Sequence, residues 1–489
     1  MAMRDATAAA AGGPFPEISR RRAEWERTNQ AKAVARSEPG LRALLSLRPW
    51  QFEISLLVAY IVITRIGALS AAKIGIQLGP APLFLTDLTL LALLAIAFIR
   101  RPGRLLFWVS SGTQAGAAGF AVWVLCLLSI IYFLKAFPTY HVFALRDLAI
   151  FGYSLFFPVA YFAISSRTLA VRVTRYFVYS GFVVALLVLL RASTGVEIPF
   201  LATQARFVGG EWIDYIGSDD FGAILACSMM AFAVYAVLEQ RLRRFHLVGL
   251  IICLLALTAN GTRSAFLGAV LAAIATFLLT SRRYRGVFVG AMAVLAIALI
   301  AGASLPTDLP GVRSLNNFYV GLASGLGGDS DQNASFRIVR WKSAIATWEQ
   351  NPVLGVGYGR DILDQTLIGD LWDQSQINRG MPHNTFLFVL ARMGLVGLGL
   401  VLFAWGAGIL TLGRAVRRWH RADELAVLNI LIVTAGFAAF VLFFERPMNN
   451  SVFWIMLAVG FRLSISNDGE RYPRPSSPTN RRAIRWMPQ

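Results

Sequence analysis

Twelve long apolar segments occupy most of this 489-residue sequence and restrict the folds open to it. A helix that crosses a bilayer needs about 20 mostly apolar residues. The candidate segments are 54–76, 83–99, 117–134, 148–164, 176–190, 221–238, 247–259, 264–279, 287–303, 385–412, 425–444 and 451–465. The chain is 56% apolar and only 15% charged, whereas soluble chains are about 45–50% apolar and about 25% charged. The sequence therefore predicts an all-α polytopic membrane protein with about twelve transmembrane helices, and it excludes a soluble enzyme.

The positive charges are concentrated in short segments between the apolar runs. Sixteen arginines lie in five such segments, at positions 100, 101 and 104, 167, 172 and 175, 241, 243 and 244, 282, 283 and 285, and 414, 417, 418 and 421. The alternate segments are poor in Lys and Arg, and short cytoplasmic loops carry the excess of these residues. Both termini are therefore expected in the cytoplasm. The net charge of +19 belongs to these loops, so no nucleic-acid partner is expected.

The remaining sequence suggests four regions. Residues 1–48 form a basic tail that we expect to contact anionic membrane lipids or a partner protein. Residues 49–246 are predicted to form a bundle of about six membrane helices. Residues 247–465 form a second membrane region that includes a large outer loop, 305–384. Residues 466–489 are rich in Pro and Arg and are expected to be a disordered cytoplasmic tail.

The loop at 305–384 is long enough to suggest a function of its own. Within it, Ser335–Gln350 is predicted to be an amphipathic helix, because apolar side chains recur at helical spacing. These residues are Ile338, Trp341, Ile345 and Trp348. Two tryptophans on one apolar stripe are typical of a helix that lies in the membrane interface.

The sequence Asn260-Gly261-Thr262-Arg263-Ser264 predicts a tight outer turn before an apolar helix. Thr262 or Ser264 is a candidate N-cap. The free N–H groups and the positive dipole end of a helix N-terminus favour anions. Arg263 adds a planar cation suited to phosphate. The alternative is an arginine that only reaches lipid headgroups.

The sequence Met381-Pro382-His383-Asn384-Thr385 lies where the large loop meets another apolar segment. Asn384 is a natural N-cap. His383 is a candidate general base, because an imidazole accepts a proton near neutral pH. The alternative is an interfacial histidine that only hydrogen-bonds the loop.

Arg337 and Arg340 are three residues apart and can reach the same anion if their segment is helical. The glycine-rich sequence Asn351–Gly359 follows them. Its glycines permit either close backbone packing or ligand binding. Glu445-Arg446 is either an ion pair or a further substrate contact. The three cysteines lie inside apolar segments without metal-ligand spacing, so neither a metal nor a cofactor is expected.

Together these motifs resemble the O-antigen ligase and Wzy-type polymerase superfamily. The matching pieces are Thr262–Gly268, the large outer loop, Arg337-x-x-x-Trp341, Asn351–Gly359 and His383-Asn384, in this order. They cover residues 260 to about 397, whereas the flanking segments match only in number and hydropathy.

The resemblance implies a metal-independent, inverting glycosyltransferase of the bacterial inner membrane with its active site facing the periplasm. The donor would be a glycan linked to undecaprenyl diphosphate. By residue, it implies that Arg263 handles the diphosphate, Arg337 is the loop arginine, and His383 is the base or orients the acceptor. Arg340 and Arg206 are further candidate diphosphate contacts.

Three functions remain open from the sequence. A ligase transfers the finished glycan to lipid A–core, and the sequence around Arg263 slightly favours it. A polymerase transfers the growing chain to another lipid-linked glycan and makes O-antigen or exopolysaccharide. A secondary transporter or lipid flippase is the alternative of another class, and its best support is Arg65 and Lys73 within the first apolar segment.

Overall fold

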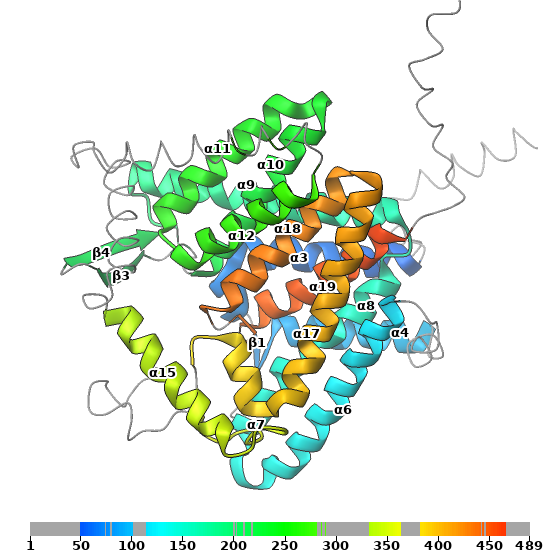
Figure 1. The fold of residues 1–489 in the computed structure, drawn as a ribbon, viewed down its shortest axis with the longest axis vertical. Coiled ribbons are helices and arrows are strands. Elements are labelled where there is room, and N and C mark those ends of the chain that lie inside the picture. The colour runs from blue at the N-terminus through cyan, green and yellow to red at the C-terminus, as the bar shows by residue number, and fades with distance from the viewer. Residues whose placement is uncertain are drawn as a thin grey trace, which may run out of the picture. The chain divides into compact units, whose positions relative to one another are not determined.

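The computed structural model describes residues 49–73, 75–78, 81–100, 114–198, 201, 203–208, 211–216, 219–280, 285, 289, 332–362, 382–441, 443–444 and 446–465. Two compact units divide the chain, residues 1–55 and 56–489. Of the first unit only residues 49–55 are described. The second unit is mainly helical, as predicted (Figure 1).

The long helices follow the apolar segments. They are α3 (Pro49–Lys73), α4 (Leu85–Arg100), α6 (Gln114–Tyr140), α7 (Val142–Gly152), α8 (Phe156–Ala163), α9 (Arg167–Thr194), α10 (Asp219–Leu238), α11 (Arg243–Asn260), α12 (Arg263–Leu279), α15 (Gln332–Glu349), α17 (Thr385–Trp419), α18 (Ala422–Ala438) and α19 (Pro447–Ser464). Two 3₁₀ turns, η2 (Tyr153–Leu155) and η3 (Gln240–Leu242), lie between α7 and α8 and before α11.

Eleven of the twelve predicted segments coincide with described helices. The exception, 287–303, lies outside the described residues apart from Val289. Six helical segments of the described chain are long and apolar enough to cross a bilayer, namely 114–140, 142–163, 167–194, 219–238, 240–260 and 385–419. The chain is therefore a multi-pass membrane protein. The number twelve and the position of the termini remain predictions.

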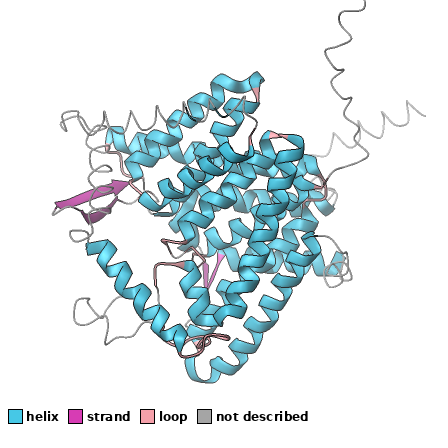
Figure 2. Cartoon of the chain, viewed as in Figure 1, coloured by secondary structure: helices cyan, strands magenta, loops and turns pink. Residues whose placement is uncertain are grey.

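Two short hairpins depart from the all-α expectation (Figure 2). The first predicted helix, 54–76, ends earlier than expected: α3 stops at Lys73, and β1 (Gly75–Leu78) pairs antiparallel with β2 (Ala81–Phe84). Ile76 faces Leu83 in the register. Four residues assigned to membrane helices therefore lie in strands, namely Gly75, Ile76, Leu83 and Phe84. The intervening Gly-Pro sequence explains the error, because proline lacks the N–H that a continuing helix needs.

The second hairpin lies between α9 and α10. β3 (Thr203–Val208) pairs with β4 (Glu211–Ile216) in a register that joins Thr203 to Ile216. α9 continues to Thr194 and ends at Gly195, whose φ of 69° is in the left-handed region that glycine adopts readily. Residues 191–220, which lie between the predicted apolar segments 176–190 and 221–238, therefore begin with the end of a helix and contain a hairpin.

The centre of the bundle is formed by α10, α18 and α19. α10 packs against α11, α12 and α18, and α19 packs against α8, α17 and α18 (Figure 1). Most side chains of α10 are buried on every face, which is typical of a helix enclosed by other helices. Exposed leucines and isoleucines instead lie on peripheral helices such as α6 and α11, where a membrane protein meets lipid.

Ion pairs hold together one end of the bundle. Arg167 Nη2 lies 2.9 Å from Glu424 Oε1, and Arg175 Nη2 lies 2.7 Å from Glu239 Oε1. Arg175 Nε also lies 3.7 Å from Asp423 Oδ1. The start of α9, the end of α10 and the start of α18 therefore meet at this end, which carries three of the arginine-rich segments.

Candidate functional site

The beginnings of four helices converge at the opposite end of α10. Gly222, in the first turn of α10, is so close to the start of α12 that an added Cβ would lie 2.5 Å from Thr262 Cβ. Asn449, in the first turn of α19, donates to Asp220 at 2.6 Å. Thr385, the first residue of α17, donates to the Val441 carbonyl at 3.0 Å. Helix N-termini carry partial positive charge, so their convergence favours an anion.

Arg263 is the first residue of α12 and is half-buried. The expected cap is not formed by Thr262, whose hydroxyl instead donates to Asn260 Oδ1 at 2.5 Å. Asn260 Nδ2 donates in turn to the Ile216 carbonyl at 2.8 Å. Gly261 has a φ of 68°, which permits the reversal. The turn thus places Arg263 beside the first turn of α10.

His383 lies just before α17, and its local structure agrees with the sequence expectation. Asn384 caps the helix by accepting from the Leu387 N–H at 3.1 Å. The Thr385 hydroxyl, which donates to Val441, also accepts from the Phe443 N–H at 2.8 Å. His383 has a φ of 53°, a left-handed conformation that is uncommon for residues other than glycine. Such local strain is frequent at functional sites.

The charges around His383 come from several parts of the chain. Burial, together with the positive charges of Arg340 and Arg337, lowers the pKa of His383 to about 4. Asp219 opposes this effect, whereas Arg446 adds to it. Three predicted site residues, Arg337, Arg340 and His383, are therefore close enough to interact electrostatically. The imidazole is neutral at pH 7 in this arrangement.

The amphipathic helix predicted at 335–350 is present as α15, Gln332–Glu349. Its buried face contains Arg340, Ser343 and Ala344. On the other side Ile338 is 49% exposed and Ile345 is 37% exposed. The helix therefore directs an arginine toward the protein while its isoleucines face outward.

The glycine-rich sequence 351–359 serves packing. The N–H of Val356 donates to the Ala391 carbonyl at 2.9 Å, which joins this loop to α17. Gly355 has a φ of 70°, and an added Cβ would lie 2.6 Å from the Ala391 carbonyl oxygen. Both observations favour the packing interpretation of these glycines over ligand binding.

The structure describes the backbone of Arg206 but not its side chain. Its backbone lies in β3, paired with Ile213, and β3 contacts α15. Its side chain lies outside the described part of the structure, so its expected contact with a diphosphate remains a prediction.

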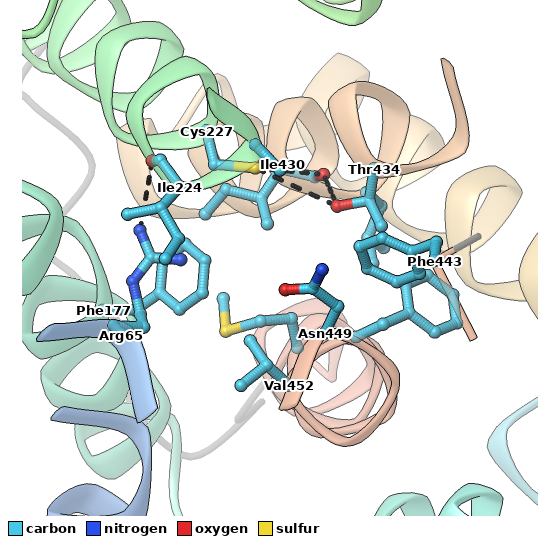
Figure 3. Close-up of a pocket in the computed structure, with 13 residues that line it drawn as sticks. Arg65, Phe177, Ile224, Cys227, Ile430, Thr434, Phe443, Asn449 and Val452 are labelled. Carbon is cyan, nitrogen blue, oxygen red and sulfur yellow. Dashed lines mark hydrogen bonds between the residues drawn. The ribbon is translucent and has the colours of Figure 1, made fainter. Parts of the chain in front are cut away.

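A small pocket is lined by residues of α3, α9, α10, α18 and α19 (Figure 3). Arg65 of α3 and Asn449 of α19 contribute its polar groups among mostly apolar walls. Arg65 donates to the hydroxyls of Ser180 at 3.1 Å and Ser228 at 3.0 Å, and its guanidinium lies 3.5 Å from the Phe177 ring centre. Side chains of α9 and α10 therefore hold Arg65, the arginine that suggested a transport path. The side chain of Lys73 is outside the described residues.

The acidic residues of the site carry no distinctive signal in the sequence. Asp219 and Asp220 begin α10, where acidic residues are ordinary helix-start signals. The sequence is compatible with Arg446 either in an ion pair or in contact with substrate. In the structure its Nη1 lies 2.5 Å from Asp220 Oδ1, which is an ion pair. Glu445 lies outside the described residues. Within the described chain, no group of three or more His, Cys, Asp or Glu side chains is arranged to bind a metal.

Comparison with known proteins identifies the region that carries these residues. No curated protein matches the chain significantly. Residues 248–402 match the family model Wzy_C, described as O-antigen ligase. This stretch contains Arg263, Arg337, Arg340 and His383. The central part of the chain is therefore similar to this family, which supports the resemblance that the sequence motifs indicated.

Proposed function

We propose that this protein is a glycosyltransferase of the O-antigen ligase type, which moves a glycan from undecaprenyl diphosphate to a hydroxyl of lipid A–core. The Wzy_C match supports the family. The electrostatic proximity of His383 to Arg337 and Arg340 is the observation that carries the proposal. The site therefore combines a neutral proton acceptor, His383, with the cations Arg337 and Arg340 beside converging helix N-termini.

The proposed reaction is an inverting displacement. The acceptor oxygen forms a bond to the anomeric carbon as the bond from that carbon to the diphosphate oxygen breaks. The bonding electron pair leaves with undecaprenyl diphosphate, and the acceptor proton passes to His383. Negative charge grows on the leaving group, and Arg263, Arg337 and Arg340 stabilise it without reorganising. No metal is assigned a role in this proposal.

The low pKa of His383 is consistent with donor binding first and proton transfer to the imidazole second. Before the donor binds, burial and the arginine charges hold the imidazole neutral but make it a weak base. A bound diphosphate offsets those charges, so the pKa of His383 rises toward its ordinary value. The imidazole then accepts a proton more readily when donor is present.

The proposal places the protein in the bacterial inner membrane with this site at the periplasmic face. The site is at the end of α10 opposite the ion-paired arginines, and arginine-rich loops are typical of the cytoplasmic side. Neither a further cofactor nor a nucleic acid is part of the proposal.

Complementation of a deletion strain tests this function. We expect His383→Ala and Arg263→Ala to reach the membrane but to abolish glycan transfer. His420→Ala is the matched control, because His420 also has a positive φ, of 49°, and ends the same helix α17 at its opposite terminus. Full activity of both site variants would overturn the assignment of the site.

The products distinguish the two related functions. Loss of all O-antigen from lipid A–core indicates a ligase. Core that carries a single glycan repeat, or loss of a secreted polymer with normal lipopolysaccharide, indicates a polymerase, which remains the alternative. The flippase alternative predicts instead that purified protein fails to join donor and acceptor when both are supplied on the same side of a vesicle.

A further inference from the structure

Arg446 is positioned by a buried carboxylate. It lies immediately before α19, and its Nη1 atom is 2.5 Å from Asp220 Oδ1. Asp220 is completely buried, and the same oxygen accepts from Asn449 Nδ2 at 2.6 Å. The Arg446 side chain is 28% exposed. Asp220 therefore fixes a guanidinium that is itself still partly accessible.

Backbone contacts fix Arg446 relative to His383. The Thr385 hydroxyl, two residues after His383, bonds to both Val441 and Phe443. The Arg446 N–H then donates to the Phe443 carbonyl at 3.3 Å. The segment that carries Arg446 is thus attached to the start of α17.

The electrostatics agree with this placement. The charge of Arg446 reaches the His383 imidazole, as do those of Arg337 and Arg340. Among the described residues, the charges of these three arginines lower the pKa of His383, whereas that of Asp219 raises it. A guanidinium has five N–H donors, so it can bind a carboxylate through one edge and a phosphate through another.

We propose that Arg446 is a further substrate-binding residue, which contacts the diphosphate of the lipid-linked donor, and that Asp220 is its positioning residue. This inference rests on the proposed function, because it takes the donor to be a polyprenyl diphosphate. Asp220 orients the guanidinium before the donor arrives, which reduces the ordering cost of binding.

The test measures binding of undecaprenyl diphosphate to purified full-length protein in phosphatidylcholine nanodiscs. We expect Arg446→Gln to weaken binding roughly tenfold or more, as loss of a charge-assisted hydrogen bond implies. Arg446→Lys keeps the charge and restores part of the affinity. Arg462→Gln is the matched control, since Arg462 lies at the far end of the same helix and donates to the Tyr161 carbonyl.

Asp220 is tested through its coupling to Arg446. Asp220→Asn keeps the shape and removes the charge, and we expect weaker binding than wild type but stronger than Arg446→Gln. The double variant should bind like Arg446→Gln alone, because the carboxylate acts through the guanidinium. Additive losses would overturn the positioning role.

Transfer assays with varied donor concentration test Arg446 separately. Arg446→Gln should raise KM for the donor with a smaller loss of kcat, and Arg446→Lys should restore KM in part.

The outcomes separate this inference from the proposed function. If wild-type protein does not bind undecaprenyl diphosphate, the proposed function fails. If wild type binds it and Arg446→Gln binds equally well, only the inference about Arg446 fails. If phosphatidylglycerol competes for the Arg446-dependent binding as well as undecaprenyl diphosphate does, Arg446 is a general headgroup contact and the inference is overturned. A misfolded Arg446→Gln, detected by size-exclusion chromatography, leaves Arg446→Lys and Asp220→Asn to decide.

Discussion

Asp147 and Arg392 form a buried ion pair in which Asp147 Oδ2 lies 3.1 Å from Arg392 Nε. It joins α7 to α17, and the same carboxylate oxygen accepts from the Gly359 N–H at 2.8 Å. Arg392 Nη1 also donates to the Gly357 carbonyl at 3.3 Å. The pair therefore fixes the loop after α15 against the helix that begins next to His383.

Removal of one partner should destabilise the protein strongly. We expect Asp147→Ala to cost about 3–5 kcal/mol, because it leaves Arg392 buried without its counter-charge. Thermal unfolding in detergent measures the loss. Glu349→Ala, at an exposed position near the same loop, is the control, and an unchanged Asp147→Ala would contradict a structural role for the pair.

Gly355 should not accept a side chain. Gly355→Ala places a Cβ against the α17 backbone in a left-handed conformation, and we expect a loss of about 1–3 kcal/mol from strain. Gly399→Ala, in the same α17 helix with open space around its Cα, should be neutral or stabilising by up to about 1 kcal/mol. Equal melting temperatures for the two variants would refute the packing interpretation of the glycine loop.

The pH dependence of transfer should report the environment of His383. The neutral imidazole is the active form, so kcat/KM should fall as pH drops through the pKa of the free enzyme, about 4. Arg340→Gln removes a positive charge that lowers this pKa, so the acidic limb should move to higher pH. Lys342→Gln, an exposed change on the same helix, should leave the limb in place, and an identical shift in both variants would argue against direct coupling.

The outward face of α15 should contact lipid. A spin label at Ile338→Cys should be more accessible to oxygen than to a water-soluble nickel complex, because Ile338 is exposed on the apolar side. The three native cysteines are buried, so labelling is directed to the introduced site. Preferential nickel access at Ile338 would place this face in water.

Local patterns were sufficient to predict most helices and to single out three residues, Arg337, Arg340 and His383, that the fold brings within electrostatic reach of one another. Eleven apolar segments predicted from hydropathy coincide with described helices, since the length of an apolar run depends only on neighbouring residues. The N-cap Asn384 was also predictable, because capping depends only on residues that are close in the sequence. The β1–β2 hairpin was missed because apolar residues suit both a strand and a membrane helix.

The sequence by itself determined that this chain is a multi-pass membrane protein with basic and histidine residues at the starts of late helices. Only the tertiary structure decided which charges act together. Asp220 and Asn449 are 229 positions apart, and no local pattern links them or assigns Asp220 to Arg446. Burial of a carboxylate requires a partner inside the fold, and packing of α10 against the start of α19 determines which residue that partner is.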